Sequence, residues 1–291
     1  MNRRGFTLIE LLVALVLGGV VMGAAYQTLV MSQRASHAMV QRIDVQQTVR
    51  AGVHYLSGLL RELDATDGDI LVATPTTMTV RARRWAGVSC TDPVAVGALV
   101  QFGVRSGSQF YFGDRAPDAN LDSILVFRDG DPASRGDDRW LVGAVRAVAA
   151  GVCTDATPAH ILSVEITAAS GGADSVLVGV TSGAPLRGIQ VDELALYQEA
   201  DGRWWMGRRT ASRTGAWSDR EPLIGPLENG GLRFSYLDSD GDPTTVIDEI
   251  AIVDVEIHGE SQYITHTTTG VNDHILDSLQ TRVALRNNAR F

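Results

Sequence analysis

Residues 3–33 read RRGFTLIELLVALVLGGVVMGAAYQTLVMSQ, and this stretch decides the fold of the N-terminal part of the chain. Glu10 is the only charged residue between Arg4 and Arg34. A helix needs about 20 apolar residues to cross the roughly 30 Å hydrocarbon core of a membrane. Leu11–Gln33 supplies twenty-three residues without a formal charge. The stretch therefore predicts a membrane-spanning helix with a carboxylate at its front end.

The leader before the apolar run is only five residues long and ends in Gly5. A secretory signal peptide is cut after its apolar core, so this leader does not follow that pattern. The run from Arg3 to Glu10 resembles the prepilin leader of type IV pilins and type II secretion pseudopilins. The resemblance implies that an inner-membrane peptidase cuts between Gly5 and Phe6, methylates the new amine of Phe6 and leaves the helix in place. A plain signal anchor is the alternative.

Glu10 is a functional candidate because ionisable groups in or beside a membrane span are costly. Phe6 lies four residues ahead of it, on nearly the same helix face. In the family that the motif resembles, this glutamate pairs with the N-terminal amine of a neighbouring subunit during filament assembly. Such a pair is tolerated in an apolar bundle, whereas either charge alone is costly. The alternative is a glutamate that only reaches the lipid headgroups. Small residues at Gly18, Gly19, Gly23, Ala24 and Ala25 would let helices approach closely.

The helix is expected to continue to Leu63. Val49, Val53, Leu56, Leu60 and Leu63 are spaced 4, 3, 4 and 3, which is helical periodicity, and Met39 and Ile43 precede them. No proline lies between Phe6 and Leu63, whereas major pilins usually carry one near position 27 of such a chain, where this one has Gln27. The predicted helix is about 85 Å long. A coiled coil over Val49–Leu63 is a weaker alternative, because two heptads are few.

The remaining residues form short alternating or apolar runs separated by Gly, Asp, Pro and Ser clusters, which is typical of strands. The predicted strands are Thr77–Arg83, Leu99–Val104, Gln109–Phe112, Ser123–Phe127, Trp140–Val145, Ile161–Thr167, Val176–Val180, Val191–Gln198, Trp204–Arg208, a strand around Leu232–Tyr236, Ile250–Ile257 and Thr281–Leu285. The expected fold class is α+β, in which a long N-terminal helix with a membrane-spanning first half packs on an antiparallel sheet with an enlarged β-rich head.

Four parts are expected along the chain. They are a prepilin leader peptide at residues 1–5, a transmembrane or filament-core helix at 6–30, an amphipathic second half of the helix at 31–66 and an extracytoplasmic β-rich head at 67–291. Residues 186–290 loosely resemble the C-terminal half of W-type minor pilins, with J-type minor pseudopilins as the second choice. Residues 70–185 resemble no family.

Composition fits an exported surface protein. The formal charge is −9, and removal of Arg3 and Arg4 with the leader changes the side-chain sum to −11. An acidic head disfavours nonspecific nucleic-acid binding, which depends on neutralising phosphates. Local arginines (Arg81, Arg83 and Arg84, or Arg203, Arg208 and Arg209) leave DNA uptake as an alternative. The chain contains no lysine, which excludes P-loop, Schiff-base and Ser-Lys chemistry.

Cys90 and Cys153 are the two cysteines of the chain. On the exported side of a membrane an even pair indicates a disulfide, with two buried thiols as the alternative. Asp238, Asp240 and Asp242 cluster hard oxygen ligands in a turn, so a structural calcium ion is a minor hypothesis, although tight turns favour the same residues. The spacing is not that of an EF-hand. No HExxH, GxSxG or Walker motif is present, so we expect neither an enzyme nor another cofactor.

The resemblance implies a minor pilin-like structural subunit, processed by prepilin peptidase and assembled through its N-terminal helix into a type IV pilus, in a priming or tip complex. Its expected partners are other pilins or pseudopilins, the prepilin peptidase, the assembly platform and the inner membrane. The resemblance implies a single-pass protein with an exported head that later joins a filament. A J-type minor pseudopilin of a type II secretion system, and a membrane-anchored surface-binding or DNA-uptake protein, are the alternatives.

Overall fold

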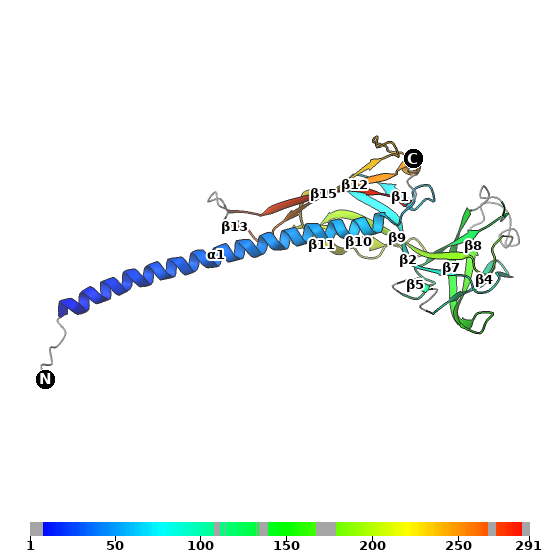
Figure 1. Ribbon diagram of the computed structural model, residues 1–291, viewed down its shortest axis with the longest axis horizontal. Coiled ribbons are helices and arrows are strands. Elements are labelled where there is room, and N and C mark those ends of the chain that lie inside the picture. Colours follow the sequence, from blue (N-terminus) through cyan, green and yellow to red (C-terminus); the bar gives the residue numbers. More distant parts are fainter. Residues whose placement is uncertain are drawn as a thin grey trace.

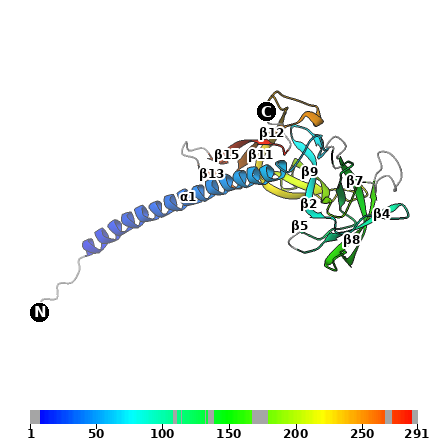
Figure 2. The ribbon, with the colours of Figure 1, turned by 45° about the vertical axis from the view of Figure 1, so that its right-hand side comes forward.

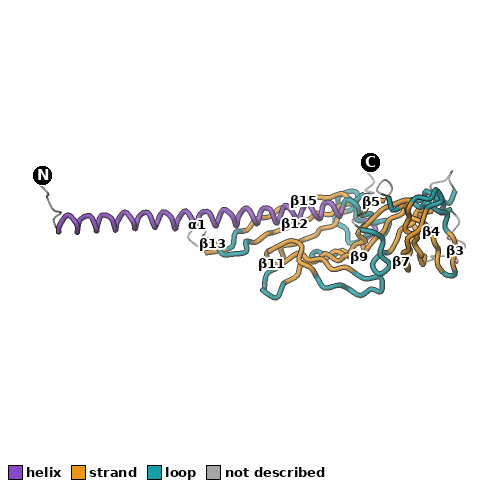
Figure 3. The backbone as a smooth tube through the Cα atoms, turned by 90° about the horizontal axis from the view of Figure 1, so that it is seen from below, coloured by secondary structure: helices purple, strands orange, loops and turns teal. Residues whose placement is uncertain are grey.

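A single long helix projects far beyond a β-rich head (Figure 1). The computed structural model describes residues 8–107, 111–113, 115–131, 133, 139–166, 179–266 and 272–286. Helix α1 spans Leu8–Leu60, which is 53 residues and about 80 Å at 1.5 Å per residue. Strands lie along its second half only, as the view from below shows (Figure 3). The structure confirms the predicted α+β architecture.

The helix ends where aspartates offer the backbone other partners. After Leu60 the chain makes a turn in which the amide of Leu63 donates to the carbonyl of Leu60 at 3.1 Å. Asp64 then accepts hydrogen bonds from the amides of Thr66 and Asp67 at 3.0 and 3.3 Å. Side-chain acceptors of this kind compete with the helical ladder and favour turns. The helix therefore ends three residues before the predicted Leu63, although Leu63 itself is still buried.

The second half of α1 packs against the sheet through one stripe. Its buried residues are Val45, Val49, Gly52, Leu56 and Leu60, spaced 4, 3, 4 and 4. Met39 and Ile43, the apolar residues that precede this stripe, are 67% and 43% exposed. The buried stripe therefore begins at Val45, a boundary that periodicity alone does not show.

The head contains fifteen named strands in the described part of the chain. Their bounds are β1 Ile70–Ala73, β2 Thr77–Val88, β3 Val94–Val96, β4 Leu99–Arg105, β5 Tyr111–Gly113, β6 Ser123–Arg128, β7 Arg139–Val152, β8 Pro158–Ile166, β9 Pro185–Gln198, β10 Trp204–Thr210, β11 Glu221–Leu237, β12 Ile252–Glu260, β13 Thr265–His266, β14 Asn272–Asp273 and β15 Leu276–Ala284, with a 3₁₀ turn, η1, at Ile247–Glu249. All pairings are antiparallel, and the main path runs β15-β12-β11-β10-β9-β6-β7-β8-β4-β3.

Most predicted strands are present and several are longer than predicted. Strand β7 continues to Val152 and β9 begins at Pro185, because pairing with neighbouring strands carries them through residues without clear alternation. The predicted strand Val176–Val180 lies largely outside the described residues, and its last two residues, Gly179 and Val180, are not in a strand. Strands β1, β3, β13 and β14 were not predicted, being only two to four residues long.

The head has two hydrophobic cores, so we describe it as two lobes. In the proximal lobe (the second half of α1 with β1, β10, β11, β12 and β15), Leu56 packs with residues such as Phe234 and Val255. In the distal lobe (β3–β8), the core includes Phe102, Val126 and Leu162. Figures 1 and 2 both show the distal lobe beyond the C-terminal end of the helix. Residues 89–184, which carry the distal lobe, are thus an insertion between β2 and β9.

Strand β9 holds the two lobes together. Its residues 192–198 pair with β10 of the proximal lobe, and its residues 186–189 pair with β6 of the distal lobe. Strand β2 pairs with β9 from Thr77 to Val88 and thus contributes to both cores. Trp85 of β2 lies against Gly188 of β9, where an added Cβ would come within 1.9 Å of the indole ring. The lobes therefore share a continuous two-stranded ribbon of backbone hydrogen bonds.

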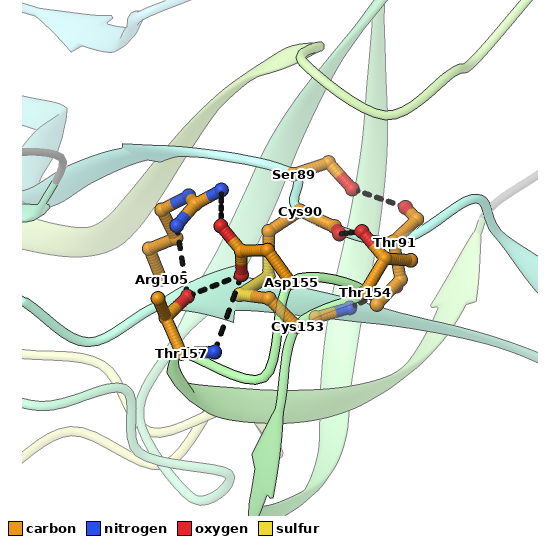
Figure 4. Close-up of a disulfide and its surroundings, with 9 residues drawn as sticks. Ser89, Cys90, Thr91, Arg105, Cys153, Thr154, Asp155 and Thr157 are labelled. Carbon is orange, nitrogen blue, oxygen red and sulfur yellow. Dashed lines mark hydrogen bonds and ion pairs between the residues drawn. A yellow bond between two sulfur atoms is a disulfide. The ribbon is translucent and has the colours of Figure 1, made fainter.

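The predicted disulfide is present in the distal lobe (Figure 4). It joins Cys90, just after β2, to Cys153 in the turn between β7 and β8, with the two Cα atoms 5.3 Å apart. Beside it, Thr157 and Arg105 donate hydrogen bonds to Asp155 and lower the pKa of its carboxyl to about 2. The bond thus closes the start of the insertion onto its β7–β8 hairpin.

Replacing Gly52 tests the helix–sheet contact. A Cβ at this position would lie 2.8 Å from Cδ1 of Ile257 and 3.1 Å from Cγ2 of Ile224, so Gly52→Leu has no room. We expect a loss of about 1 to 3 kcal/mol in unfolding free energy, measured by thermal unfolding of the full chain in detergent. Gly58→Leu, on the exposed side of the same helix with nothing within 4 Å, is the control and should not destabilise the head. Equal stability of the two variants would contradict this packing.

Removing the disulfide tests its contribution to the insertion. Because Cys90 and Cys153 are 63 residues apart, Cys90→Ser should destabilise the distal lobe by about 4 kcal/mol in the chain-entropy account. Unfolding is followed with and without reductant. Reductant should lower the melting temperature of the parent chain and leave the double variant Cys90→Ser/Cys153→Ser unchanged. A parent chain insensitive to reductant would show that the bond adds nothing to stability.

Candidate functional site

The first half of α1 is uncovered by the rest of the chain. Every residue from Leu8 to Leu29 is exposed, including twelve large apolar side chains: Leu8, Ile9, Leu11, Leu12, Val13, Leu15, Val16, Leu17, Val20, Val21, Met22 and Leu29. Soluble monomers rarely expose apolar patches of more than a few hundred Å². The helix is also long and apolar enough to cross a membrane. This segment therefore has to be covered by lipid or by other apolar helices.

Glu10 is the acidic residue in the first turn of α1. A helix N-terminus carries partial positive charge, which favours a carboxylate at this position. The side chain is exposed in the single chain. Gly5 and Phe6, the predicted cleavage and methylation residues, lie outside the described residues. The structure thus places Glu10 at the end of the helix from which the leader extends, and the roles of the three residues stay predictions.

The predicted small-residue patch faces open space. A Cβ added at Gly18, Gly19 or Gly23 would meet nothing within 4 Å. In contrast, Gly259 of β12 is pressed against the second half of the same helix, with a hypothetical Cβ 2.7 Å from Cγ2 of Val49. The three N-terminal glycines therefore serve no packing within the described chain, and they leave a shallow face on which another helix can approach.

The helix passes residue 27 without interruption. The Thr28 hydroxyl donates to the carbonyl of Ala24 at 2.9 Å, and the helix is continuous from Leu8 to Leu60. This agrees with the prediction from the missing proline. The exposed apolar half and the docked half therefore belong to one continuous helix.

The aspartates of the calcium hypothesis serve the turn instead. Oδ1 of Asp238 accepts the backbone amides of Asp240 and Asp242, each at 2.9 Å. Gly241 has a φ of 89°, the left-handed conformation that such a turn requires. No group of three His, Cys, Asp or Glu side chains that could hold a metal ion occurs in the described residues, these aspartates included. The structure does not support the calcium site.

The two arginine groups considered for DNA binding are divided among separate contacts. On β2, Arg83 pairs with Glu62 at 2.5 Å, whereas Arg84 pairs with Asp192. In the second group, Arg203, Arg208 and Arg209 face Asp201, Glu221 and Glu193, with closest N–O distances of 3.4, 3.7 and 2.6 Å. Nonspecific nucleic-acid binding depends on the number of phosphates neutralised, and the carboxylates beside five of these six arginines partly compensate their charge.

One contact with the helix was missed by the sequence analysis. The segment after β12 returns to α1, where the amide of Tyr263 donates to Oε1 of Gln41 at 3.4 Å. Tyr263 and Ile264 are 60% and 59% exposed, so the apolar surface of the helix continues onto the head. Residues 261–264 read Ser-Gln-Tyr-Ile, a run too short to show strand alternation, so the sequence carries no clear signal for this contact.

Residues 1–26 match a family described as the prokaryotic N-terminal methylation motif. No curated protein and no solved structure matches the chain. The matched residues include the five-residue leader, Phe6, Glu10 and the glycine face. With the projecting apolar helix, the motif indicates a pilin-type protein that is processed by a prepilin peptidase and anchored in a membrane.

Proposed function

We propose that the chain is a minor pilin-like structural subunit that joins a type IV pilus through its N-terminal helix, in a priming or tip complex. The observation that carries the proposal is the uncovered half of α1, combined with the methylation motif at residues 1–26. An apolar rod of this length is stable in a bilayer and equally in a bundle of like helices. Transfer from one to the other needs no unfolding of the head, because the buried stripe of the helix begins only at Val45.

The charge at Glu10 supports assembly by pairing. After cleavage between Gly5 and Phe6, the amine of Phe6 lies one helical turn ahead of its own Glu10. In a staggered bundle, the amine of an incoming subunit reaches the carboxylate of its neighbour, and each charge compensates the other in an apolar surrounding. The role is structural rather than catalytic, and the assembly motor, the platform and the peptidase are other chains.

The head is on the exported side in this proposal. The Cys90–Cys153 disulfide supports this orientation, because such bonds persist in oxidising compartments and are rare in the cytosol. Arg3 and Arg4 precede the apolar run, which is the arrangement expected when the short N-terminal end stays on the cytoplasmic side. The W-type assignment rests on residues 186–290, and a J-type minor pseudopilin is the second candidate.

Processing at Gly5 tests the pilin-type assignment. We expect co-expression with a prepilin peptidase to yield a mature chain that begins with N-methyl-Phe6, detected by mass spectrometry of the purified protein. Without the peptidase, the chain should keep its leader. A mature chain that retains Met1 in the presence of an active peptidase, or one cut beyond Ala24, contradicts the proposal and favours a plain signal anchor or a signal peptide.

Replacing Glu10 separates processing from assembly. Glu10→Ala should be cleaved normally, and its incorporation into filaments should fall roughly tenfold or more, because an unpaired amine in an apolar bundle costs several kcal/mol. Incorporation is measured by immunoblotting of sheared filaments. Asp44→Ala removes an exposed carboxylate from the same helix and is the control that should assemble normally. Normal incorporation of Glu10→Ala would remove this role of the carboxylate.

A further inference from the structure

An open cleft of about 630 Å³ lies where the two lobes meet. Its walls come from β2, β9 and β10, from the loop that precedes β6 and from the turn between β10 and β11. The two loops are tied together, because the amide and Nε of Arg213 donate to the carbonyls of Asn120 and Ala119 at 2.9 and 3.1 Å. Ligand sites in proteins occupy about 300 to 1,000 Å³ and occur preferentially between domains. The cleft therefore has the size and the place of a binding site.

Arginines line the cleft with their carboxylate partners behind them. The side chain of Arg84 is 18% exposed and that of its partner Asp192 is 1% exposed; for Arg115 and Asp122 the values are 30% and 0%. Each pair thus presents its cation to the cleft and buries its anion. Arg208 is the third lining guanidinium; Glu221, whose side chain is 72% exposed, also lines the cleft and lies 3.7 Å from Arg208, within ion-pair distance.

The buried carboxylates hold the guanidinium groups in fixed positions. Asp122 accepts hydrogen bonds from both Nη atoms of Arg115, from Nε1 of Trp85 and from the amide of Asp118, at 2.5 to 2.9 Å. Asp192 also accepts the hydroxyl of Thr210, and Gln190 accepts Nε of Arg84 at 3.0 Å. Such a network orients the cations before any ligand arrives, which reduces the entropy lost on binding. Arg84 uses Nε and Nη2 for these partners and Arg115 uses both Nη atoms, and a guanidinium has five N–H donors, so the remaining N–H groups can donate to a ligand carboxylate.

An aromatic ring and neutral polar groups complete the lining. Trp217 is 39% exposed, and the guanidinium of Arg209 lies 4.6 Å from its ring centroid. Arg209 is itself held by two hydrogen bonds to Glu193. Ser212 and Ser218 add hydroxyl groups to the same wall. A sugar packs its C–H face on an indole ring and pairs its hydroxyls with hydroxyl, amide and guanidinium groups, so this combination fits a carbohydrate better than a wholly apolar ligand.

We propose that this cleft binds an acidic saccharide, a short run of sugar units that carry carboxylates. Trp217 supplies the stacking surface, and Arg208 with the oriented Arg84 and Arg115 supplies the charge. A single-stranded nucleic acid shares the need for stacking and cations. It is disfavoured because affinity for it grows with the number of phosphates neutralised, and the cleft offers three guanidinium groups in a chain of net charge −9. The site is in the head and does not depend on the role of the helix.

The test is a calorimetric titration of the full chain in detergent. Three ligands are compared: tetragalacturonate, the neutral cellotetraose and an oligothymidylate of eight nucleotides. We expect tetragalacturonate to bind, cellotetraose to bind at least about tenfold more weakly, and the affinity for tetragalacturonate to fall as salt is added. No binding of tetragalacturonate, equal binding of the neutral sugar, or tighter binding of the oligothymidylate would overturn the proposal.

Variants place the binding in the cleft. Arg208→Gln removes a charge without leaving a buried carboxylate unpaired, which Arg84 or Arg115 variants would do. Arg208→Gln should weaken tetragalacturonate binding about tenfold, and Trp217→Phe should weaken it less. Arg146→Gln is the control, because Arg146 pairs with Glu165 on β7 and β8, outside the cleft. Binding that is unchanged in Arg208→Gln, or reduced equally in Arg146→Gln, would contradict the site.

Discussion

The structure depends on the need to cover an apolar surface that the chain itself leaves open. From Leu8 to Leu29 the helix is not covered by the head. From Val45 to Leu60 one stripe of the same helix is buried against β11, β12 and β15. The two halves of α1 therefore have different surroundings, and the chain itself covers only the second half. The hydrophobic effect makes the first half an obligatory interface with lipid or with other helices. The glycine face, the carboxylate of Glu10 and the unbroken backbone at Thr28 all lie on this uncovered half or at its end.

In the head, the distal lobe is attached to the proximal lobe by strands that are shared between them. Strands β2 and β9 extend from the proximal core into the distal core, so the lobes are joined by backbone hydrogen bonds along Thr77–Val88 rather than by a linker. Trp85 fills the junction against Gly188, and the disulfide closes the insertion onto itself at Cys90. The ion pair Arg115–Asp122, in which only the carboxylate is fully buried, lies at the same junction. A buried carboxylate needs a partner, and the consequence here is that the guanidinium group is held at the rim of the cleft.

Local sequence patterns were sufficient to predict the helix and most strands, because these depend on interactions between residues that are close in sequence. The charge-free run, the leader and the period of Val49, Val53, Leu56 and Leu60 predicted the helix, and short alternating runs predicted most strands. Two features depend on partners that a local pattern does not show. Met39 and Ile43 share the apolar character of the buried stripe but lie ahead of it and are exposed, and Asp238 accepts the backbone amides of its own turn. The local pattern of a helix or a turn does not show how far the neighbouring strands extend along it.

The sequence by itself determined that residues 1–26 match a prokaryotic N-terminal methylation motif and that the apolar run there is long enough to cross a membrane as a helix, because hydropathy and a short motif depend only on neighbouring residues. It also determined that two cysteines were available to pair, and Asp and Gly clusters marked the turns. Only the tertiary structure decided that residues 89–184 form a second lobe, that β9 is shared by both cores, and that Arg84, Arg115, Arg208 and Trp217 line one cleft. These residues are up to 133 positions apart, from 84 to 217, and strand pairing across such separations follows from the register of the whole sheet, which no local pattern specifies.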